Sequence, residues 1–343
     1  MSVSAAVYGC SGLVLEAAER AFFRAARPWG FILFARNIDT PQQVRRLVAS
    51  LREAAGHEAQ ILIDQEGGRV QRLRPPQWQN YPPGRAYGDL YARDAEAGLA
   101  AARLGARLIA ADLRALGITI DCLPVLDVPS PGAHDVIGDR AYAATPDKVT
   151  ALGRAAANGL LAGGVLPVMK HIPGHGRAVA DSHMSLPIVT ALRGELEDAD
   201  FRPFHALRDL PLAMTAHVVY TAIDPDAPAT TSKKLIDEII RRHIGFAGLL
   251  MSDDLSMEAL AGGLDERAQA SLAAGCDVVL HCNGRMAEME AVARAVPALQ
   301  GLARDRADSA VVALPRHVED LDPAENHARL AEFLVADAED RWG

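Results

Sequence analysis

Eight short apolar segments alternate with amphipathic segments along this chain of 343 residues. The apolar segments are rich in aliphatic and β-branched residues and are bounded by glycine, proline or charged residues, which predicts strands covered on both faces. The expected strands are residues 3–8, 30–34, 60–64, 118–122, 166–170, 211–215, 248–252 and 276–281. The segments between them, such as 40–55 and 94–116, predict helices. Thr40-Pro41 and Thr145-Pro146 have the form of a helix cap followed by a first-turn proline.

Eight strands that alternate with helices predict an α/β fold, a (β/α)8 TIM-type barrel in a single domain with long loops after its strands. A doubly wound sheet is the alternative. That fold calls for a G-x-G-x-x-G fingerprint after its first strand, which Gly9-Cys10-Ser11-Gly12 does not provide. We expect residues 1–300 to form the catalytic barrel. Residues 301–343 are expected to form a C-terminal helical tail packed on it, with a helix at about 322–338.

Charge and composition narrow the choice of partners. The 35 Lys and Arg against 44 Asp and Glu give a net charge of −9, which argues against a nucleic-acid binder. No uninterrupted apolar run reaches the roughly 18 residues of a membrane span, and the N-terminus lacks the features of a secretory signal. Four scattered cysteines without a CxxC pair predict buried reduced thiols. We expect a cytoplasmic protein with a small-molecule substrate, a monomer or, alternatively, a weak homodimer.

Ionisable side chains stand where five of the expected strands end: Asp64, Lys170 and His171, His217, Asp253, and His281. Burying such groups without partners is costly, so their recurrence at these positions is unusual. The carboxyl ends of barrel strands meet on one face, which would place these groups in one pocket. The alternative is that each charge marks where a strand meets solvent. His217 either touches a ligand or satisfies a backbone group.

The segment KHIPGHG at 170–176 continues to Asp181-Ser182-His183 and has the glycine-rich composition of a mobile loop. Asp181 and His183 are two residues apart, so in an extended stretch their side chains point to the same side. The carboxylate could then orient the imidazole and raise its basicity, as in a catalytic triad without its serine. A solvated Asp and His on a surface loop are the alternative.

The segment GLLMSDDLSM at 248–257 places Asp253 and Asp254 between an apolar strand and a helix. We expect one carboxylate to face the pocket and the other to turn away and cap the helix. A carboxylate at a barrel mouth, opposite a proton donor, is the arrangement for glycoside cleavage through a covalent intermediate.

Three motifs in consistent order resemble the β-N-acetylhexosaminidases of glycoside hydrolase family 3, and among them the single-domain type of Gram-negative cell-wall recycling. The motifs are IDQEGGRVQR at 63–72, the KHIPGHG…DSH stretch and MSDDLSM. The resemblance runs from about residue 5 to about residue 300.

The resemblance implies a role for each matching residue. Asp253 would be the nucleophile, His183 the general acid/base and Asp181 its orienting partner. The residues implied to bind the non-reducing sugar are Asp64, Arg72, Arg140, Lys170 and His171. The implied activity is a retaining exo-β-N-acetylglucosaminidase that acts on 1,6-anhydro muropeptide fragments, with neither cofactor nor metal.

Several alternatives stay open. The same site could pass the glycosyl group to phosphate, or act as a broader β-glycosidase. Lys170 could form a Schiff base, although no second lysine lies nearby in the sequence to depress its pKa. The histidines could bind zinc, although their spacing follows no HExxH pattern: His171, His175, His183, His217 and His281. A barrel that only binds its ligand is the last alternative, and the presence of every implied catalytic residue argues against it.

Overall fold

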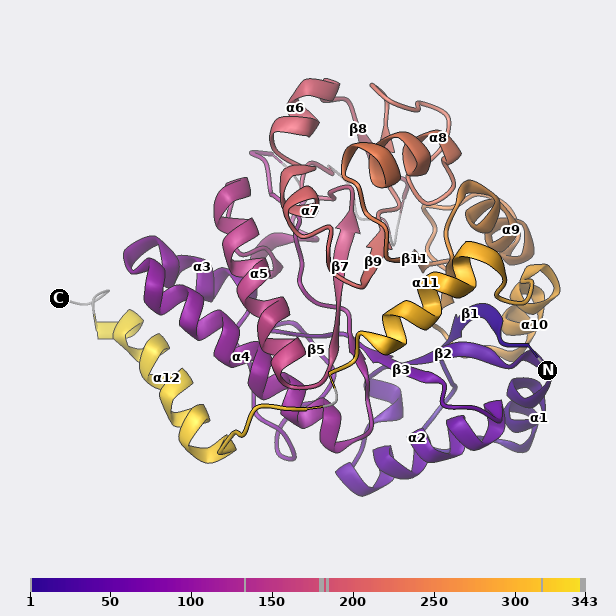
Figure 1. Ribbon diagram of the computed structural model, residues 1–343, viewed down its shortest axis with the longest axis horizontal. Helices are drawn as coiled ribbons and strands as arrows, with labels where there is room; N and C mark the ends of the chain where they lie inside the picture. The colour runs from indigo at the N-terminus through magenta and orange to yellow at the C-terminus, as the bar shows by residue number, and fades with distance from the viewer. Residues whose placement is uncertain (1, 133, 179–181, 183–184, 316, 340–343) are drawn as a thin grey trace.

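The computed structural model describes residues 2–132, 134–178, 182, 185–315 and 317–339. Eight strands form a closed barrel in the order β1-β12-β11-β9-β7-β6-β3-β2, and neighbouring strands are parallel (Figure 1). They are β1 (Ser4–Tyr8), β2 (Pro28–Leu33), β3 (Gln60–Ile63), β6 (Ile120–Asp121), β7 (Leu166–Ile172), β9 (Leu212–Thr215), β11 (Leu249–Asp254) and β12 (Val278–His281). Each overlaps a strand expected from an apolar segment. The predicted (β/α)8 barrel is confirmed, and the doubly wound alternative is wrong.

Helices surround the barrel and connect its strands (Figure 1). They are α1 (Ala17–Ala26), α2 (Pro41–Ala55), α3 (Gly84–Arg93), α4 (Ala95–Ala115), α5 (Pro146–Ala162), α6 (Arg193–Asp198), α7 (Arg202–Ala206), α8 (Lys233–Leu235) with the π-helix η3 (Ile236–His243), α9 (Leu264–Ala274) and α10 (Met286–Ala295). Thr40 caps α2 as predicted, because its side-chain oxygen accepts a hydrogen bond from the N–H of Gln43. Thr145 precedes α5 without a side-chain cap bond, and Pro146 begins the helix.

The interior of the barrel is filled by apolar side chains. Val7, Leu62, Val168 and Met251 belong to one buried cluster that the inward faces of the strands share. Ala307 and Ala310 of α11 (Gly301–Val312) belong to the same cluster. Backbone hydrogen bonds join residues 297–299 to the start of β1, which places α11 across the amino-terminal end of the barrel. A site for a ligand is therefore left at the carboxyl end.

The last helix, α12 (Pro323–Glu339), packs on α4 and α3 (Figure 1). The segment that leads to it is tied down by an ion pair between Arg103 and Glu319, with an N···O distance of 2.7 Å. The expected tail helix is thus present. The division of the chain into domains at residue 300 stays a prediction.

Short strands in two loops shape the carboxyl end of the barrel. β4 (Gln65–Gly67) and β5 (Val70–Gln71) form an antiparallel hairpin directly after β3. β8 (Ile188–Val189) and β10 (Val219–Tyr220) pair in parallel and join the loop after β7 to the loop after β9. These pairs hold the loops that extend beyond the barrel strands.

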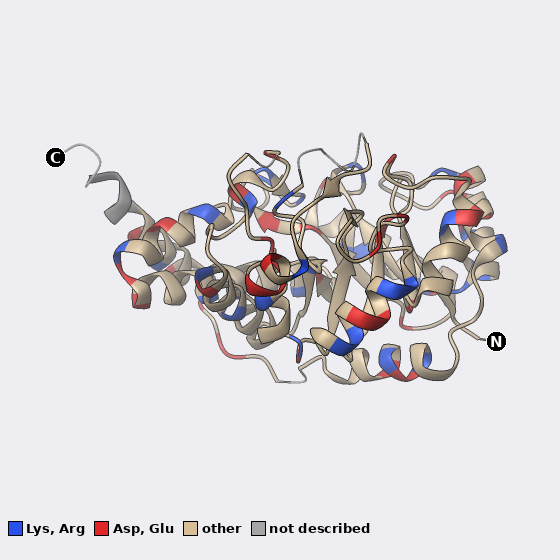
Figure 2. Ribbon diagram, turned by 90° about the horizontal axis from the view of Figure 1, so that it is seen from above, with Lys and Arg blue, Asp and Glu red and all other residues tan. Residues whose placement is uncertain are grey.

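The surface carries both signs of charge. Lys and Arg alternate with Asp and Glu along the outer helices in the view of Figure 2. The four cysteines, Cys10, Cys122, Cys276 and Cys282, are buried and unpaired, as predicted. Within the described part of the chain, every helix is too short or too polar to cross a membrane.

Candidate active site

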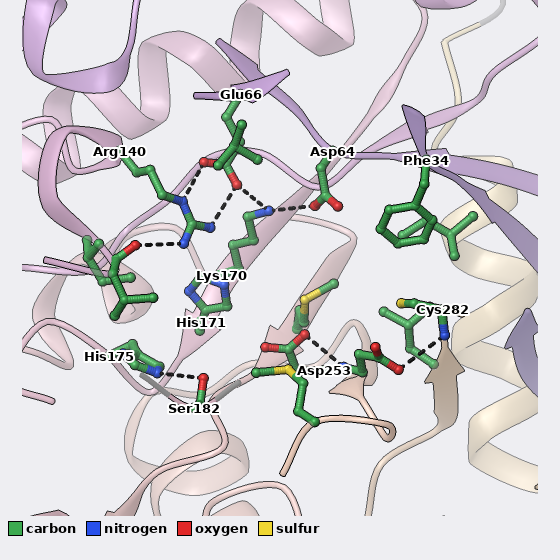
Figure 3. Close-up of a pocket in the computed structure, with 18 of the residues that line it drawn as sticks. Phe34, Asp64, Glu66, Arg140, Lys170, His171, His175, Ser182, Asp253 and Cys282 are labelled. Atoms are coloured by element: carbon green, nitrogen blue, oxygen red, sulfur yellow. Dashed lines mark hydrogen bonds and ion pairs between the residues drawn. The ribbon is translucent and has the colours of Figure 1, made fainter. Parts of the chain in front are cut away.

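A cavity of about 310 Å³ opens at the carboxyl end of the barrel, and six of the sequence-predicted residues line it. They come from four separate parts of the chain: Asp64, Arg72, Arg140, Lys170, His171 and Asp253. Figure 3 shows Asp64, Glu66 and Lys170 together on one side of the cavity and Asp253 across from them. The other two predicted residues, Asp181 and His183, lie outside the described residues.

Charged side chains form a continuous series of ion pairs along one wall (Figure 3). Lys170 Nζ lies 2.9 Å from Asp64 Oδ1 and 2.6 Å from Glu66 Oε1. Arg140 forms a bidentate pair with Glu66, with two N···O distances of 2.8 Å. Glu66 lies in the β4–β5 hairpin, and sequence reasoning assigned it no role. The structure shows that it holds Lys170 and Arg140 in place.

The charges of this wall are fixed at neutral pH. Burial alone would raise the pKa values of Asp64 and Glu66, but the neighbouring cations lower both, and the pKa of Glu66 falls to about 2. Burial alone would lower the pKa of Lys170, but the two carboxylates raise it above its ordinary value. Lys170 is therefore held as an ammonium group, without the free electron pair that Schiff-base formation requires. This argues against the Schiff-base alternative.

Arg72 completes the pairing of Asp64, since its Nη2 lies 3.0 Å from Asp64 Oδ2. The guanidinium group of Arg72 also lies over the ring of Phe34, 5.3 Å from the ring centroid. Phe34 lines the cavity and adds an apolar face to an otherwise charged wall. Hydroxyl groups and C–H groups on one ligand, as in a sugar ring, match this combination.

β7 presents two consecutive residues to the cavity. Consecutive strand residues ordinarily face opposite sides, but the register of β7 against β9 shifts between Lys170 and Ile172, and both Lys170 and His171 line the cavity. His171 Nδ1 donates to Asp127 Oδ2 at 2.7 Å, which fixes the orientation of the ring.

Asp127 is a site residue that sequence reasoning missed. Its Oδ1 accepts hydrogen bonds from the backbone N–H groups of His171 and His175, at 3.1 and 2.7 Å. Burial alone would raise the pKa of Asp127, but His171 and these hydrogen bonds lower it to about 2. The available signal was an apolar run, Leu123–Leu126, that ends in a carboxylate. This run lies beyond the expected strand at 118–122.

Asp253 and Asp254 both line the cavity, at the end of β11, where the register against β12 shifts between Met251 and Asp254. The expectation that one carboxylate faces the pocket and the other turns away stays a prediction, and in the described part of the chain no helix begins directly after Asp254 for the second to cap. Asp254 instead holds its own loop: it accepts hydrogen bonds from the N–H and hydroxyl of Ser256, at 3.0 and 2.6 Å, and from the N–H of Cys282, at 3.1 Å. Asp253 Oδ1 accepts one from the N–H of Asp254 at 2.8 Å. Asp254 is committed to structure, which favours Asp253 for chemistry.

The histidines that follow β9 and end β12 are buried outside the cavity. His217 Nε2 donates to the carbonyl of Asp254 at 3.0 Å, and its Nδ1 lies 2.6 Å from Thr230 Oγ1. His217 thus satisfies a backbone group next to Asp253. His281 is buried, and its Nε2 lies 3.8 Å from Glu288 Oε2. Among the described residues, no three His, Cys, Asp or Glu side chains are grouped so that they could hold a metal ion.

Fold and cavity together define a class of protein. A charged cavity at the carboxyl end of parallel barrel strands is where enzymes of this fold carry their active sites. Fixed carboxylates and cations beside an aromatic face suit a small polar substrate such as a sugar. The protein is a (β/α)8-barrel enzyme with a cavity of the carbohydrate-binding kind.

Comparison with known proteins gives the family, and the chain belongs to glycoside hydrolase family 3. The profile described as the glycosyl hydrolase family 3 N terminal domain matches residues 17–316. A beta-hexosaminidase of Alkalilimnicola ehrlichii is 40% identical over 338 residues, which cover 97% of this chain and 89% of that protein. A beta-hexosaminidase of Methylococcus capsulatus is 44% identical over 273 residues, covering 78% of this chain and 80% of that protein.

A solved structure agrees with this assignment. NagZ from Neisseria gonorrhoeae, in complex with N-trifluoroacetyl-D-glucosamine, superimposes with a TM-score of 0.85 at 32% identity, covering 97% of this chain and 99% of that one. The predicted resemblance to the β-N-acetylhexosaminidases of family 3 is confirmed. The predicted class of enzyme, a glycoside hydrolase, is confirmed with it.

Proposed function

We propose that the protein is a retaining exo-β-N-acetylglucosaminidase that removes non-reducing terminal N-acetylglucosamine from 1,6-anhydro muropeptide fragments, in cytoplasmic peptidoglycan recycling. One observation carries the proposal. Asp253 lines the same cavity as the Asp64–Lys170 pair, and Ser182, the residue between Asp181 and His183, lines it too. The names of the relatives, and the N-acylated glucosamine in the gonococcal structure, support the choice of sugar.

The proposed reaction has two steps. In the first, Asp253 attacks the anomeric carbon, the glycosidic C–O bond breaks, and the departing oxygen takes a proton from His183. In the second, water gives a proton to His183 and attacks the same carbon, and the ester bond to Asp253 breaks. Two inversions at one carbon retain the β configuration. Asp181 orients the imidazole of His183 throughout.

A histidine acid suits a site that already contains many carboxylates. A carboxylic acid close to ionised Asp253 would meet like-charge repulsion whenever it lost its proton, whereas an imidazole becomes neutral on losing its proton. Histidine also titrates near ~6.5 when unperturbed, so both of its protonation states are accessible at neutral pH.

The charged wall supplies the binding contacts in this scheme. Asp64 can accept hydrogen bonds from sugar hydroxyls, and Arg72, Arg140 and Lys170 can donate to hydroxyl or carbonyl oxygens. These groups are already oriented by one another, so they need little reorganisation when the sugar binds. His171 lies beside them, fixed by Asp127.

The proposal is tested by product and adduct analysis. A chromogenic β-N-acetylglucosaminide should release the β-anomer first, as NMR of the early products would show, and a β-configured 2-fluoro sugar should leave a stable adduct on Asp253 in a peptide map. An initial α-product, or a label on Asp254, would contradict it. Turnover with and without phosphate separates hydrolysis from phosphorolysis, because only the latter produces a sugar 1-phosphate.

A further inference from the structure

Ser182 is a buried residue in the loop after β7, and it is held from two directions. Its hydroxyl lies 3.3 Å from His175 Nε2. Its carbonyl accepts a hydrogen bond from the N–H of Ala259, at 3.3 Å, in the loop that follows Asp253 and Asp254. Figure 3 shows the contact with His175 at the edge of the cavity. Ser182 therefore links the loop after β7 to the loop that follows the proposed nucleophile.

His175 is itself fixed by the barrel. Asp127 accepts a hydrogen bond from its backbone N–H, and Asp127 also orients His171. Next to His175, Gly176 lies so close to the carbonyl of Val128 that a Cβ atom there would come within 2.0 Å of the oxygen. The position of the His175 ring is thus set by Asp127 and by the loop after β6.

The segment around His175 is anchored at further points. The hydroxyl of Tyr220 donates to the carbonyl of Gly174. Arg177 Nε lies 2.6 Å from Asp200 Oδ2, and Asp200 is almost fully buried. The carbonyl of Ala178 accepts a hydrogen bond from the N–H of His134 at 2.8 Å. Residues 173–178 are therefore held in place by several contacts, and His175 in this segment contacts Ser182 at the edge of the cavity.

His175 is held in its neutral form at neutral pH. Burial and the neighbouring His171 lower the pKa of His175 to about 4, although Asp127 opposes this. The ring is therefore neutral near pH 6.5, roughly where an unperturbed histidine titrates. A change in the pH profile of a Ser182 variant would accordingly report on another group.

We propose that His175 and Ser182 are positioning residues that set the place of the peptide carrying Asp181 and His183 relative to Asp253. This inference rests on the proposed function, in which His183 is the general acid/base. Ser182 contributes no proton to the reaction. Its contacts with His175 and Ala259 join the loop after β7 to the loop after β11, the strand that carries the proposed nucleophile.

The test compares two substrates that differ in their need for an acid. The dinitrophenolate group of a 2,4-dinitrophenyl β-N-acetylglucosaminide leaves without protonation, whereas the phenolate group of the phenyl glycoside needs a proton to leave. Ser182→Ala should lower kcat/KM for the phenyl glycoside by about tenfold and change that for the dinitrophenyl glycoside less than about twofold. The limb of the pH profile assigned to the acid should shift or flatten for the phenyl substrate.

A second pair of variants tests the hydrogen bond itself. His175→Leu should reproduce the loss seen in Ser182→Ala, whereas His175→Gln, which can place a polar atom near the former Nε2, should restore most of the activity. The double variant Ser182→Ala/His175→Leu should be no slower than the slower single variant, because both remove one interaction. Additive losses would overturn the proposal.

Two further variants separate the possible failures. Ser271→Ala removes another buried serine hydroxyl, which bonds to the carbonyl of Arg267 on α9, and should leave both substrates unchanged. His183→Ala should slow the phenyl glycoside far more than the dinitrophenyl glycoside. If His183→Ala discriminates but Ser182→Ala slows both substrates equally or neither, the positioning role is wrong and the proposed function stands. If His183→Ala does not discriminate, the proposed function fails and the inference fails with it.

Discussion

The ammonium nitrogen of Lys170 lies 2.9 Å from a carboxylate oxygen of Asp64, although β3 and β7, which carry the two residues to the cavity, are separated by more than a hundred residues of chain. Lys170 is buried, Asp64 is partly exposed to the cavity, and Glu66 contacts the same nitrogen at 2.6 Å. Each group holds the other in its charged form. The arrangement of this wall is therefore set by mutual pairing of protein groups.

Removing the cation from this wall should damage both binding and stability. Lys170→Met leaves Asp64 and Glu66 buried with one cation fewer, so we expect a loss of about 3 kcal/mol in the free energy of unfolding and a KM raised at least tenfold. Denaturant unfolding and steady-state kinetics measure the two effects. Lys233→Met, at an exposed pair with Asp237, is the matched control and should cost less than about 0.5 kcal/mol. An unchanged KM in Lys170→Met would show that the wall does not touch the sugar.

Substitutions of the two adjacent carboxylates at the end of β11 should have different effects on kinetics. Asp253→Ala should lower kcat by about a thousandfold or more, because no covalent intermediate can form. Added azide should restore turnover of the dinitrophenyl glycoside and yield the α-glycosyl azide, which NMR identifies. Asp254→Asn loses hydrogen bonds to Ser256 and Cys282 and should lower the melting temperature while it retains measurable hydrolysis. Azide rescue of an Asp254 variant instead would reverse the assignment.

Asp200 should make stability depend on pH in a defined direction. Burial raises its pKa from 3.8 to about 6, although Arg177 opposes the shift. The folded state therefore binds this proton more tightly than the unfolded state, and the resulting stability is fully present below pH 4 and lost as the pH rises through about 6. Relative to the wild type, Asp200→Asn should gain roughly 3 kcal/mol in unfolding free energy between pH 4 and pH 7.5. Denaturant titrations at the two pH values measure this difference, and a constant difference would contradict it.

Asp127 should matter for the orientation of His171. Asp127→Asn replaces one acceptor oxygen with a donor that faces His171 Nδ1–H or a backbone N–H, so a buried hydrogen bond is lost. We expect a destabilisation of about 2 kcal/mol and a loss of binding for N-acetylglucosamine, measured by calorimetry. Asp209→Asn, at an exposed pair with Arg154, is the control. Wild-type affinity in Asp127→Asn would mean that His171 does not contact the sugar.

Most of the fold could be predicted from the sequence, because eight buried strands leave eight apolar runs that polar residues interrupt. Asp64, Lys170 and Asp253 could be found for the same reason: each charge directly follows a run that must be buried. Asp127 could not, because β6 is only Ile120–Asp121, and the chain beyond it pairs with β7 irregularly, through backbone hydrogen bonds and an isolated bridge between Val125 and Lys170. That contact depends on three-dimensional closure of the barrel.

The role of each polar neighbour was also beyond the sequence. Nothing in the order of residues tells which of Asp64 and Glu66 meets Lys170, and the structure shows that both do. The sequence predicts that one of Asp253 and Asp254 faces the pocket and that the other turns away, without telling which. Both residues line the cavity, and the hydrogen bonds that the Asp254 carboxylate accepts from Ser256 and Cys282 distinguish it from Asp253.

The apolar side chains inside the barrel, and helix α11 across its amino-terminal end, determine how a ligand can enter and leave the cavity. In the part of the chain that the structure describes, apolar side chains close the inner end of the cavity, so a ligand enters and leaves through the same opening. Under the proposed exo-activity, a long glycan does not pass through the barrel, and each released monosaccharide leaves the cavity before another chain end binds. The released sugar should thus compete directly with incoming substrate for the same cavity.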